Sequence, residues 1–314
     1  MKQRILTGLI IVIVLTSAFL LREFTMYAFD AFVLFLSIIS AYEFSKLLKK
    51  FNYYNNNLVS MVYPVLSYGL FLLSLLTQMK LYLAVIIQVA LLILSVLFVF
   101  IYGVLFKKQT DNEIKTRNLH TRLDKFSFNK SVHTLFTLLY PSVLLFPLYL
   151  LNHIGQIGLY TNELHTSNIG LITLIFALLI PVITDTFSML CGSLFKGKKL
   201  CPKLSPNKTI SGAIGGIFFA VLISVCVFLI VDSTNAFSAL ISSINLQLWH
   251  IILLAFVASL ACQCGDLFES YIKRRANVKD SGDILPGHGG ILDRIDSHLF
   301  CYIIVLMFFV FLLI

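Results

Sequence analysis

Residues 248–314 read LWHIILLAFVASLACQCGDLFESYIKRRANVKDSGDILPGHGGILDRIDSHLFCYIIVLMFFVFLLI. Two strongly apolar runs, at 248–268 and 298–314, enclose a segment rich in charged residues and glycine. A helix that crosses the hydrocarbon of a bilayer needs about 20 mainly apolar residues and satisfies its backbone polar groups internally. This stretch therefore predicts two membrane-spanning helices joined by a polar connection.

The same alternation extends over all 314 residues, of which 58% are hydrophobic and only 12% are charged. Soluble domains carry about 25% charged residues, so the polar surface here is too small to cover a water-soluble globule. We expect an all-α, polytopic integral membrane protein with about nine transmembrane helices. The apolar runs that predict them are 5–21, 24–45, 58–78, 81–106, 132–151, 169–190, 212–231, 248–268 and 298–314.

Basic residues predict how the chain is oriented, because cytoplasmic connections are enriched in Lys and Arg. With the N-terminus inside, 22 of the 24 basic residues fall on the inner side, and only Arg22 and Lys80 fall outside. We expect a cytoplasmic N-terminus and an outer C-terminus. The compact chain favours a bacterial inner membrane, with the polar segment between the last two apolar runs facing the cytoplasm.

No internal repeat or low-complexity linker marks a domain boundary. The hydrophilic connection 107–131 follows the fourth apolar run. We expect an N-terminal transmembrane region, 1–131, with about four spans, and a C-terminal catalytic region, 132–314, with about five.

Three kinds of chemical group gather between the last two spans. Carboxylates are the hard ligands that Mg²⁺ prefers, and Mg²⁺ often shares them with substrate phosphates. Basic side chains donate to polyphosphates, and glycines let the backbone approach an anion. The candidates are Asp266, Asp293 and Asp296; Lys273, Arg274, Lys279 and Arg294; and Gly289 and Gly290. Together they predict a site for phosphoryl or nucleotidyl transfer.

Plainer interpretations exist for single members of this set. A Lys-Arg-Arg run beside a span is usually a topology signal, a Gly-Gly pair is often a turn, and a single histidine such as His288 is more often structural. The lysines of the loop 196–208 have the same plain explanation. The combination favours a site, because topology alone does not explain aspartates at the ends of both spans.

Residues 270–296 resemble the signature of the phosphatidate cytidylyltransferase family, which is S-x-x-K-R, four residues, K-D, and then L-P-x-H-G-G-x-x-D-R-x-D. Its fixed positions are filled by Ser270, Lys273, Arg274, Lys279, Asp280, Leu285, Pro286, His288, Gly289, Gly290, Asp293, Arg294 and Asp296. The resemblance continues over 265–269 and extends more weakly to Asp185, 205–212 and Glu43. Within 205–212 the chain departs from the family, with Asn207 and Ser211 where relatives carry Lys and Glu.

The resemblance implies transfer of a cytidylyl group from CTP to phosphatidate, giving CDP-diacylglycerol and pyrophosphate. It implies that Asp266 and Asp293 hold one or two Mg²⁺ ions, with Asp296 as a ligand or a partner of a ligand. Arg294 either contacts the triphosphate or pairs with an aspartate. The other implied catalytic residues are Lys273, Arg274 and Lys279, which would hold the triphosphate, and Asp280 and His288. The implied substrate-binding residues are Ser205, Lys208, Ser270, Gly289 and Gly290.

Three alternatives stay open at this stage. A CTP-dependent enzyme acting on another lipid acceptor would share the same chemistry. A transporter would use the charged residues as a pathway, but such proteins often have internal repeats and midplane sites. A non-catalytic scaffold would leave the carboxylates and glycines unexplained. We expect CTP and membrane phosphatidate as partners and no nucleic acid, and a homodimer is an expectation that rests on the resemblance alone.

Overall fold

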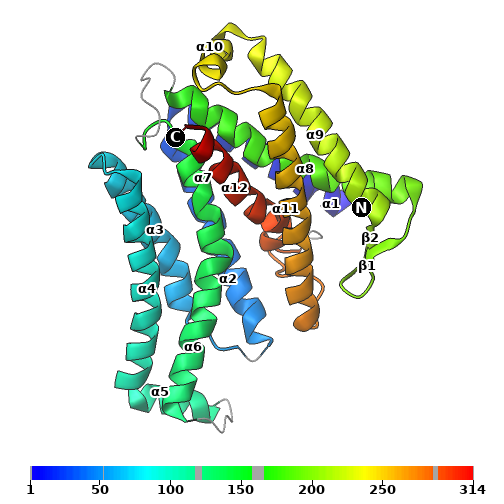
Figure 1. The fold of residues 1–314 in the computed structure, drawn as a ribbon. Helices are drawn as coiled ribbons and strands as arrows, with labels where there is room; N and C mark the ends of the chain where they lie inside the picture. The colour runs from blue at the N-terminus through cyan, green and yellow to red at the C-terminus, as the bar shows by residue number, and fades with distance from the viewer. Residues whose placement is uncertain (1, 52, 117–121, 158–165, 286–288, 314) are drawn as a thin grey trace. The chain divides into compact units, whose positions relative to one another are not determined.

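The computed structural model describes residues 2–51, 53–116, 122–157, 166–285 and 289–313. Within these ranges the chain is mainly helical, with one small β-hairpin (Figure 1). The helices are α1 (Lys2–Phe24), α2 (Met26–Lys49), α3 (Asn57–Leu76), α4 (Leu81–Leu105), α5 (Lys107–Thr116), α6 (Leu123–Thr137), η1 (Leu138–Val143), α7 (Leu144–Asn152), α8 (Thr166–Phe195), α9 (Ile210–Asp232), α10 (Asn235–Ser243), α11 (Leu248–Arg275) and α12 (Leu292–Leu313). The strands are β1 (Lys199–Cys201) and β2 (Ser205–Thr209).

Eight helical segments of the described chain have the length and hydropathy needed to cross a membrane. They are α2, α3, α4, the continuous segment from α6 to α7, α8, α9, α11 and α12. Each coincides with a predicted span, which confirms the all-α, multi-pass membrane fold. The first predicted span lies within α1. Its crossing of the membrane stays a prediction, as does the orientation of both termini.

Several predicted connections are partly helical. The connection 107–131 contains α5 and the start of α6, and 232–247 contains α10. Lys273 and Arg274 lie in the last turn of α11, and Asp293 lies in the first turn of α12, so these residues are on helices and not in a loop. Hydropathy predicts helices that are too short, because the charged residues at their ends are helical but are not apolar.

The chain folds into two compact units. The first comprises Met1–Val143 and Val278–Leu292, and the second comprises Leu144–Asn277 and Asp293–Ile314. The segment Val278–Leu292, which joins α11 to α12 in the sequence, therefore belongs with the N-terminal helices.

In the first unit α2 packs against α1 and α3, and α4 packs against α3 and α6. Buried hydrophobic side chains fill the space where α3, α4 and η1 meet: Val59, Tyr63, Val99 and Leu138. Polar side chains also connect helices, since Ser60 Oγ of α3 lies 2.6 Å from Thr137 Oγ1 of α6. Such bonds satisfy polar groups that lipid cannot hydrate.

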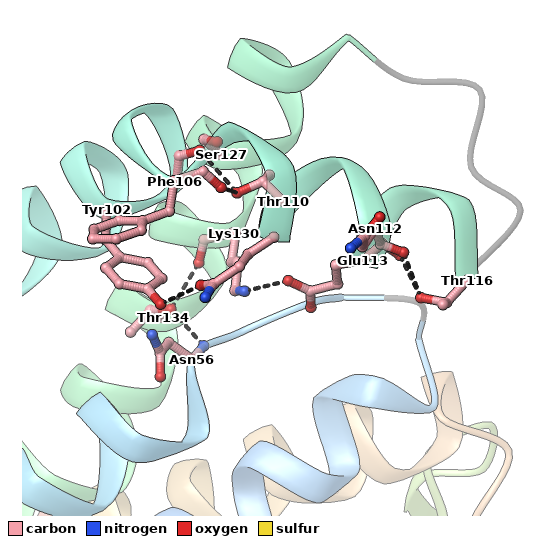
Figure 2. Close-up of polar contacts among 12 residues, drawn as sticks. Asn56, Tyr102, Phe106, Thr110, Asn112, Glu113, Thr116, Ser127, Lys130 and Thr134 are labelled. Atoms are coloured by element: carbon pink, nitrogen blue, oxygen red, sulfur yellow. Dashed lines mark hydrogen bonds and ion pairs between the residues drawn. The ribbon is translucent and has the colours of Figure 1, made fainter.

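Helix α5 packs against α6 through polar contacts (Figure 2). Lys130 Nζ of α6 lies 2.6 Å from Glu113 Oε2 of α5. The Thr110 hydroxyl donates to the carbonyl oxygen of Gly103 in α4 at 2.8 Å. These contacts show that the start of the predicted hydrophilic loop is a packed helix.

In the second unit, among the described helices, α8 and α9 make the most extensive contact. Glycines of α9 permit the close approach, because a Cβ atom on Gly212 would lie only 2.5 Å from the Ser188 carbonyl oxygen of α8. Gly215 is equally close to Cys191. Small residues at helix interfaces of this kind drive association where lipid replaces water.

The hairpin of the second unit directly precedes α9. Lys199 pairs with Thr209, and Cys201 pairs with Ser205, in antiparallel register. The Thr209 hydroxyl caps α9 by accepting a hydrogen bond from the Gly212 N–H at 3.1 Å. Lys208 directly precedes this capping residue, so β2 fixes its position beside the start of α9.

Candidate active site

The end of α11 carries one polar face. Glu269, Ser270 and Lys273 follow Asp266 by three, four and seven residues, a spacing that places their side chains on the same side of the helix as Asp266. Lys273 Nζ lies 3.5 Å from Glu269 Oε1, one helical turn away. The Ser270 hydroxyl points back to Asp266 Oδ1 at 3.4 Å.

Helix α12 brings two more carboxylates to Lys273. The Lys273 Nζ atom lies 2.8 Å from Asp293 Oδ1 and 4.0 Å from Asp296 Oδ2. All four side chains are largely buried, and that of Glu269 is fully so. We name Glu269, Asp293 and Asp296 the carboxylate cluster. One ammonium group thus lies near three buried acidic side chains, an arrangement that is costly in a low-dielectric setting unless protons or a further cation compensate it.

The hairpin supplies a second lysine. Lys208 of β2 forms an ion pair with Asp266 of α11. A second contact holds the hairpin to the same helix, because Arg274 Nε donates to the Leu204 carbonyl oxygen at 3.2 Å. The predicted residue Ser205 lies at the start of β2 and is half-buried. Sequence positions about 60 residues apart are therefore joined in one polar site.

Helix α8 contributes Asp185. The Ser297 hydroxyl of α12 donates to Asp185 Oδ2 at 2.6 Å. The backbone N–H of Ser297 donates to Asp296 Oδ1 at 2.8 Å. Ser297 thus connects Asp185 to the carboxylate cluster.

Four of the remaining predicted residues belong to a different unit from the lysines and carboxylates described above. Lys279, Asp280, Gly289 and Gly290 belong to the segment Val278–Leu292 of the first unit. Lys279 and Asp280 are exposed, as is Arg294 in the first turn of α12. His288 lies outside the described residues.

Sequence reasoning did not assign roles to Glu269, Ser297 or Glu43. Helical spacing could have found Glu269, since it lies one turn from both Asp266 and Lys273. No comparable signal marks Ser297, whose partner is 112 positions away. Glu43 becomes significant only through its contacts with residues about 250 positions later.

The residues have the chemistry of a cation site, because carboxylate oxygens are hard ligands. The carboxylate oxygens of Glu269 receive no hydrogen bond from a donor among the described residues. In the same described part of the chain, no three acidic, histidine or cysteine side chains converge as a metal site. Instead Asp266 and Asp293 are paired with Lys208 and Lys273.

Comparison with known proteins agrees with these features. A phosphatidate cytidylyltransferase of Staphylococcus saprophyticus is 39% identical over 148 residues, which are 47% of this chain and 52% of that protein. Those of Staphylococcus haemolyticus and Staphylococcus epidermidis are 42% and 44% identical over 135 residues, or 43% of this chain and 48% of each relative. The chain spans about half the length of the curated relatives it matches.

A family model covers far more of the chain than these pairwise matches. The model described as the cytidylyltransferase family matches residues 2–312. This range includes α11, α12 and the hairpin, which together carry the paired lysines and carboxylates. Because the match runs over nearly all of the sequence, the chain belongs to the cytidylyltransferase family.

Proposed function

We propose that this protein transfers a cytidylyl group from CTP to phosphatidate, producing CDP-diacylglycerol and pyrophosphate. Family membership, relatives named phosphatidate cytidylyltransferase and the filled pattern at 270–296 support this proposal. The observation that carries it is the contact of Lys273 with the buried carboxylate cluster on α11 and α12. A site at the ends of membrane-spanning helices suits a reaction between a dissolved nucleotide and a lipid.

In this reaction a phosphate oxygen of phosphatidate attacks the α-phosphorus of CTP. A new P–O bond forms, the bond to the oxygen of the β-phosphate breaks, and pyrophosphate leaves with that oxygen. The attacking oxygen is anionic near neutral pH, so the protein needs to position the reactants and neutralise charge more than to remove a proton. Lys208, Lys273 and Arg274 are the described basic residues best placed to donate to phosphate oxygens.

We also propose that Mg²⁺ assists the reaction. Asp266, Asp293 and Asp296 would hold it, as hard oxygen ligands. Because Asp266 and Asp293 pair with lysines in this structure, binding of the ion requires these ion pairs to separate. When bound, Mg²⁺ would neutralise charge on the triphosphate and the leaving pyrophosphate.

We place the protein in a bacterial inner membrane with the site facing the cytoplasm, where CTP is dissolved. The distribution of basic residues supports this orientation. We propose a homodimer on the family resemblance, and light scattering of the detergent-purified protein would measure its mass.

The direct test uses the full-length protein in detergent with CTP, phosphatidate and Mg²⁺. We expect CDP-diacylglycerol and pyrophosphate in equal amounts, and a loss of about 100-fold or more in Asp293→Asn. Asp232→Asn changes an exposed acid at the far end of α9 and is the matched control. Chelation of Mg²⁺ should stop the reaction, and its return should restore it.

Two results would change the proposal. Turnover with another phosphorylated lipid but not with phosphatidate would keep the chemistry and replace the acceptor. If no lipid acceptor releases pyrophosphate from CTP, the cytidylyltransferase activity itself is wrong.

A further inference from the structure

Glu43 of α2 is a buried carboxylate that the proposed chemistry does not use. Its residue is only 1% exposed and lies inside a span. A carboxylate at membrane depth is costly unless it has partners. Glu43 finds them in the segment Val278–Leu292, which belongs to the same unit.

The Glu43 carboxylate accepts two backbone hydrogen bonds. The N–H of Ile291 donates to Oε1 at 3.1 Å, and the N–H of Leu292 donates to Oε2 at 2.8 Å. Leu292 is the first residue of α12, and the first N–H groups of a helix have no partner within it. A negative charge is favourable at a helix N-terminus. Glu43 therefore caps a helix from a position 249 residues earlier in the chain.

Two glycines make room for this contact. A Cβ atom on Gly290 would lie 2.6 Å from Glu43 Oε2, and one on Gly282 would lie 2.8 Å from the carboxyl carbon Cδ. Both distances are shorter than van der Waals contact allows, so a larger residue at either position would displace the carboxylate. Glu43 is thus packed against both ends of the segment.

The segment has a defined shape between these points. The Leu285 N–H donates to the Gly289 carbonyl oxygen at 2.9 Å. Gly289 has φ of 80°, a backbone conformation that residues with a side chain rarely adopt. The same segment carries Lys279, Asp280, Gly289 and Gly290. Asp293 is the residue that directly follows the end of the segment.

We infer that Glu43 is a positioning residue for the cytidylyl-transfer site, because its carboxylate anchors the segment Val278–Leu292 and the start of α12. This inference rests on the proposed function for its catalytic consequence. The anchoring itself rests only on contacts inside the first unit. Glu43 acts through the backbone that it holds and does not need to touch the substrate.

The test separates anchoring from catalysis. Amide hydrogen exchange measures the protection of the Ile291 and Leu292 N–H groups in the full-length protein. Glutamine keeps the size of Glu43 but offers only one acceptor oxygen, so Glu43→Gln leaves one N–H facing a donor. We expect these two amides to exchange about tenfold faster or more in Glu43→Gln, and kcat/KM for CTP to fall about 10- to 100-fold.

Asp30→Asn is the matched control for a change in a buried acid of the same helix. Asp30 is fully buried in α2, and its Oδ2 accepts a hydrogen bond from the Tyr68 hydroxyl of α3 at 3.2 Å. We expect this variant to lower thermal stability without raising the exchange rate of the Ile291 and Leu292 amides. If these amides exchange faster in both variants, the first unit has loosened as a whole, and the inference is overturned.

A second comparison tests the shared contact. Gly282→Ala displaces the Glu43 carboxylate, so its effect on kcat/KM and that of Glu43→Gln should not multiply in the double variant. Effects that multiply, or wild-type exchange rates in Glu43→Gln, would overturn the inference. If the wild type does not use CTP and phosphatidate, the proposed function fails, and the exchange rates still decide whether Glu43 is the anchor.

Discussion

Lys273 Nζ lies 2.8 Å from Asp293 Oδ1, which joins the last turn of α11 to the first turn of α12. The same ammonium is 3.5 Å from Glu269 and 4.0 Å from Asp296. Breaking a buried ion pair by removing one partner is strongly destabilising, because the other charge stays buried without compensation. Lys273 therefore has a structural effect as well as its proposed role toward phosphate.

Lys273→Met removes this cation while keeping a side chain of similar length. We expect the free energy of unfolding to fall by about 3–5 kcal/mol, together with a loss of CTP turnover. Thermal unfolding in detergent measures the first effect. Lys273→Arg, which keeps the charge, should recover most of the stability. A Met variant as stable as the wild type would contradict the proposed dependence of the carboxylate cluster on Lys273.

Substitutions of Lys208 and Lys203, two lysines of the hairpin, can be compared directly. Lys208 pairs with Asp266, whereas Lys203 is exposed in the turn between β1 and β2. We expect Lys208→Met to raise KM for CTP about tenfold or more, since one charge-assisted contact to phosphate is lost. Lys203→Met should leave KM near the wild-type value. Equal effects of the two changes would mean that the hairpin attracts CTP only through its overall charge.

Gly212 of the second unit tests close packing between helices, and Gly69 of the first unit tests the cost of a glycine in an open helix position. Gly212→Ala places a methyl group 2.5 Å from a backbone carbonyl oxygen that cannot rotate away. We expect a loss of about 1–3 kcal/mol in unfolding free energy from this overpacking. Gly69→Ala has nothing within 4 Å and should stabilise α3 by up to about 1 kcal/mol. Thermal denaturation of both variants measures these changes in stability. If Gly212→Ala does not change the unfolding free energy, α8 and α9 can move apart to accept the methyl group.

A double-mutant cycle tests the hydrogen bond from Ser297 to Asp185. We expect Ser297→Ala and Asp185→Ala to show a coupling free energy of about 1 kcal/mol, since each change removes the same hydrogen bond. Unfolding of the two single variants and the double variant supplies the measurement. Additive effects would argue against a direct contact at 2.6 Å.

The positions of eight of the nine predicted spans followed from apolar run length, because the thickness of the bilayer imposes that length on any crossing helix. The filled pattern at 270–296 likewise indicated the family, which the match over 2–312 confirmed. Helix ends were less predictable. Lys273 and Asp293 are charged, and hydropathy therefore assigned both to a loop although they lie in helices.

The partners of the site residues came only from tertiary structure. Nothing in the local sequence pairs Lys208 with Asp266, Ser297 with Asp185, or Glu43 with the backbone of Leu292. Local periodicity reaches only about one helical turn in each direction. Contacts between residues tens or hundreds of positions apart arise from how whole helices pack, and that packing depends on side-chain shape and on where small residues permit close approach.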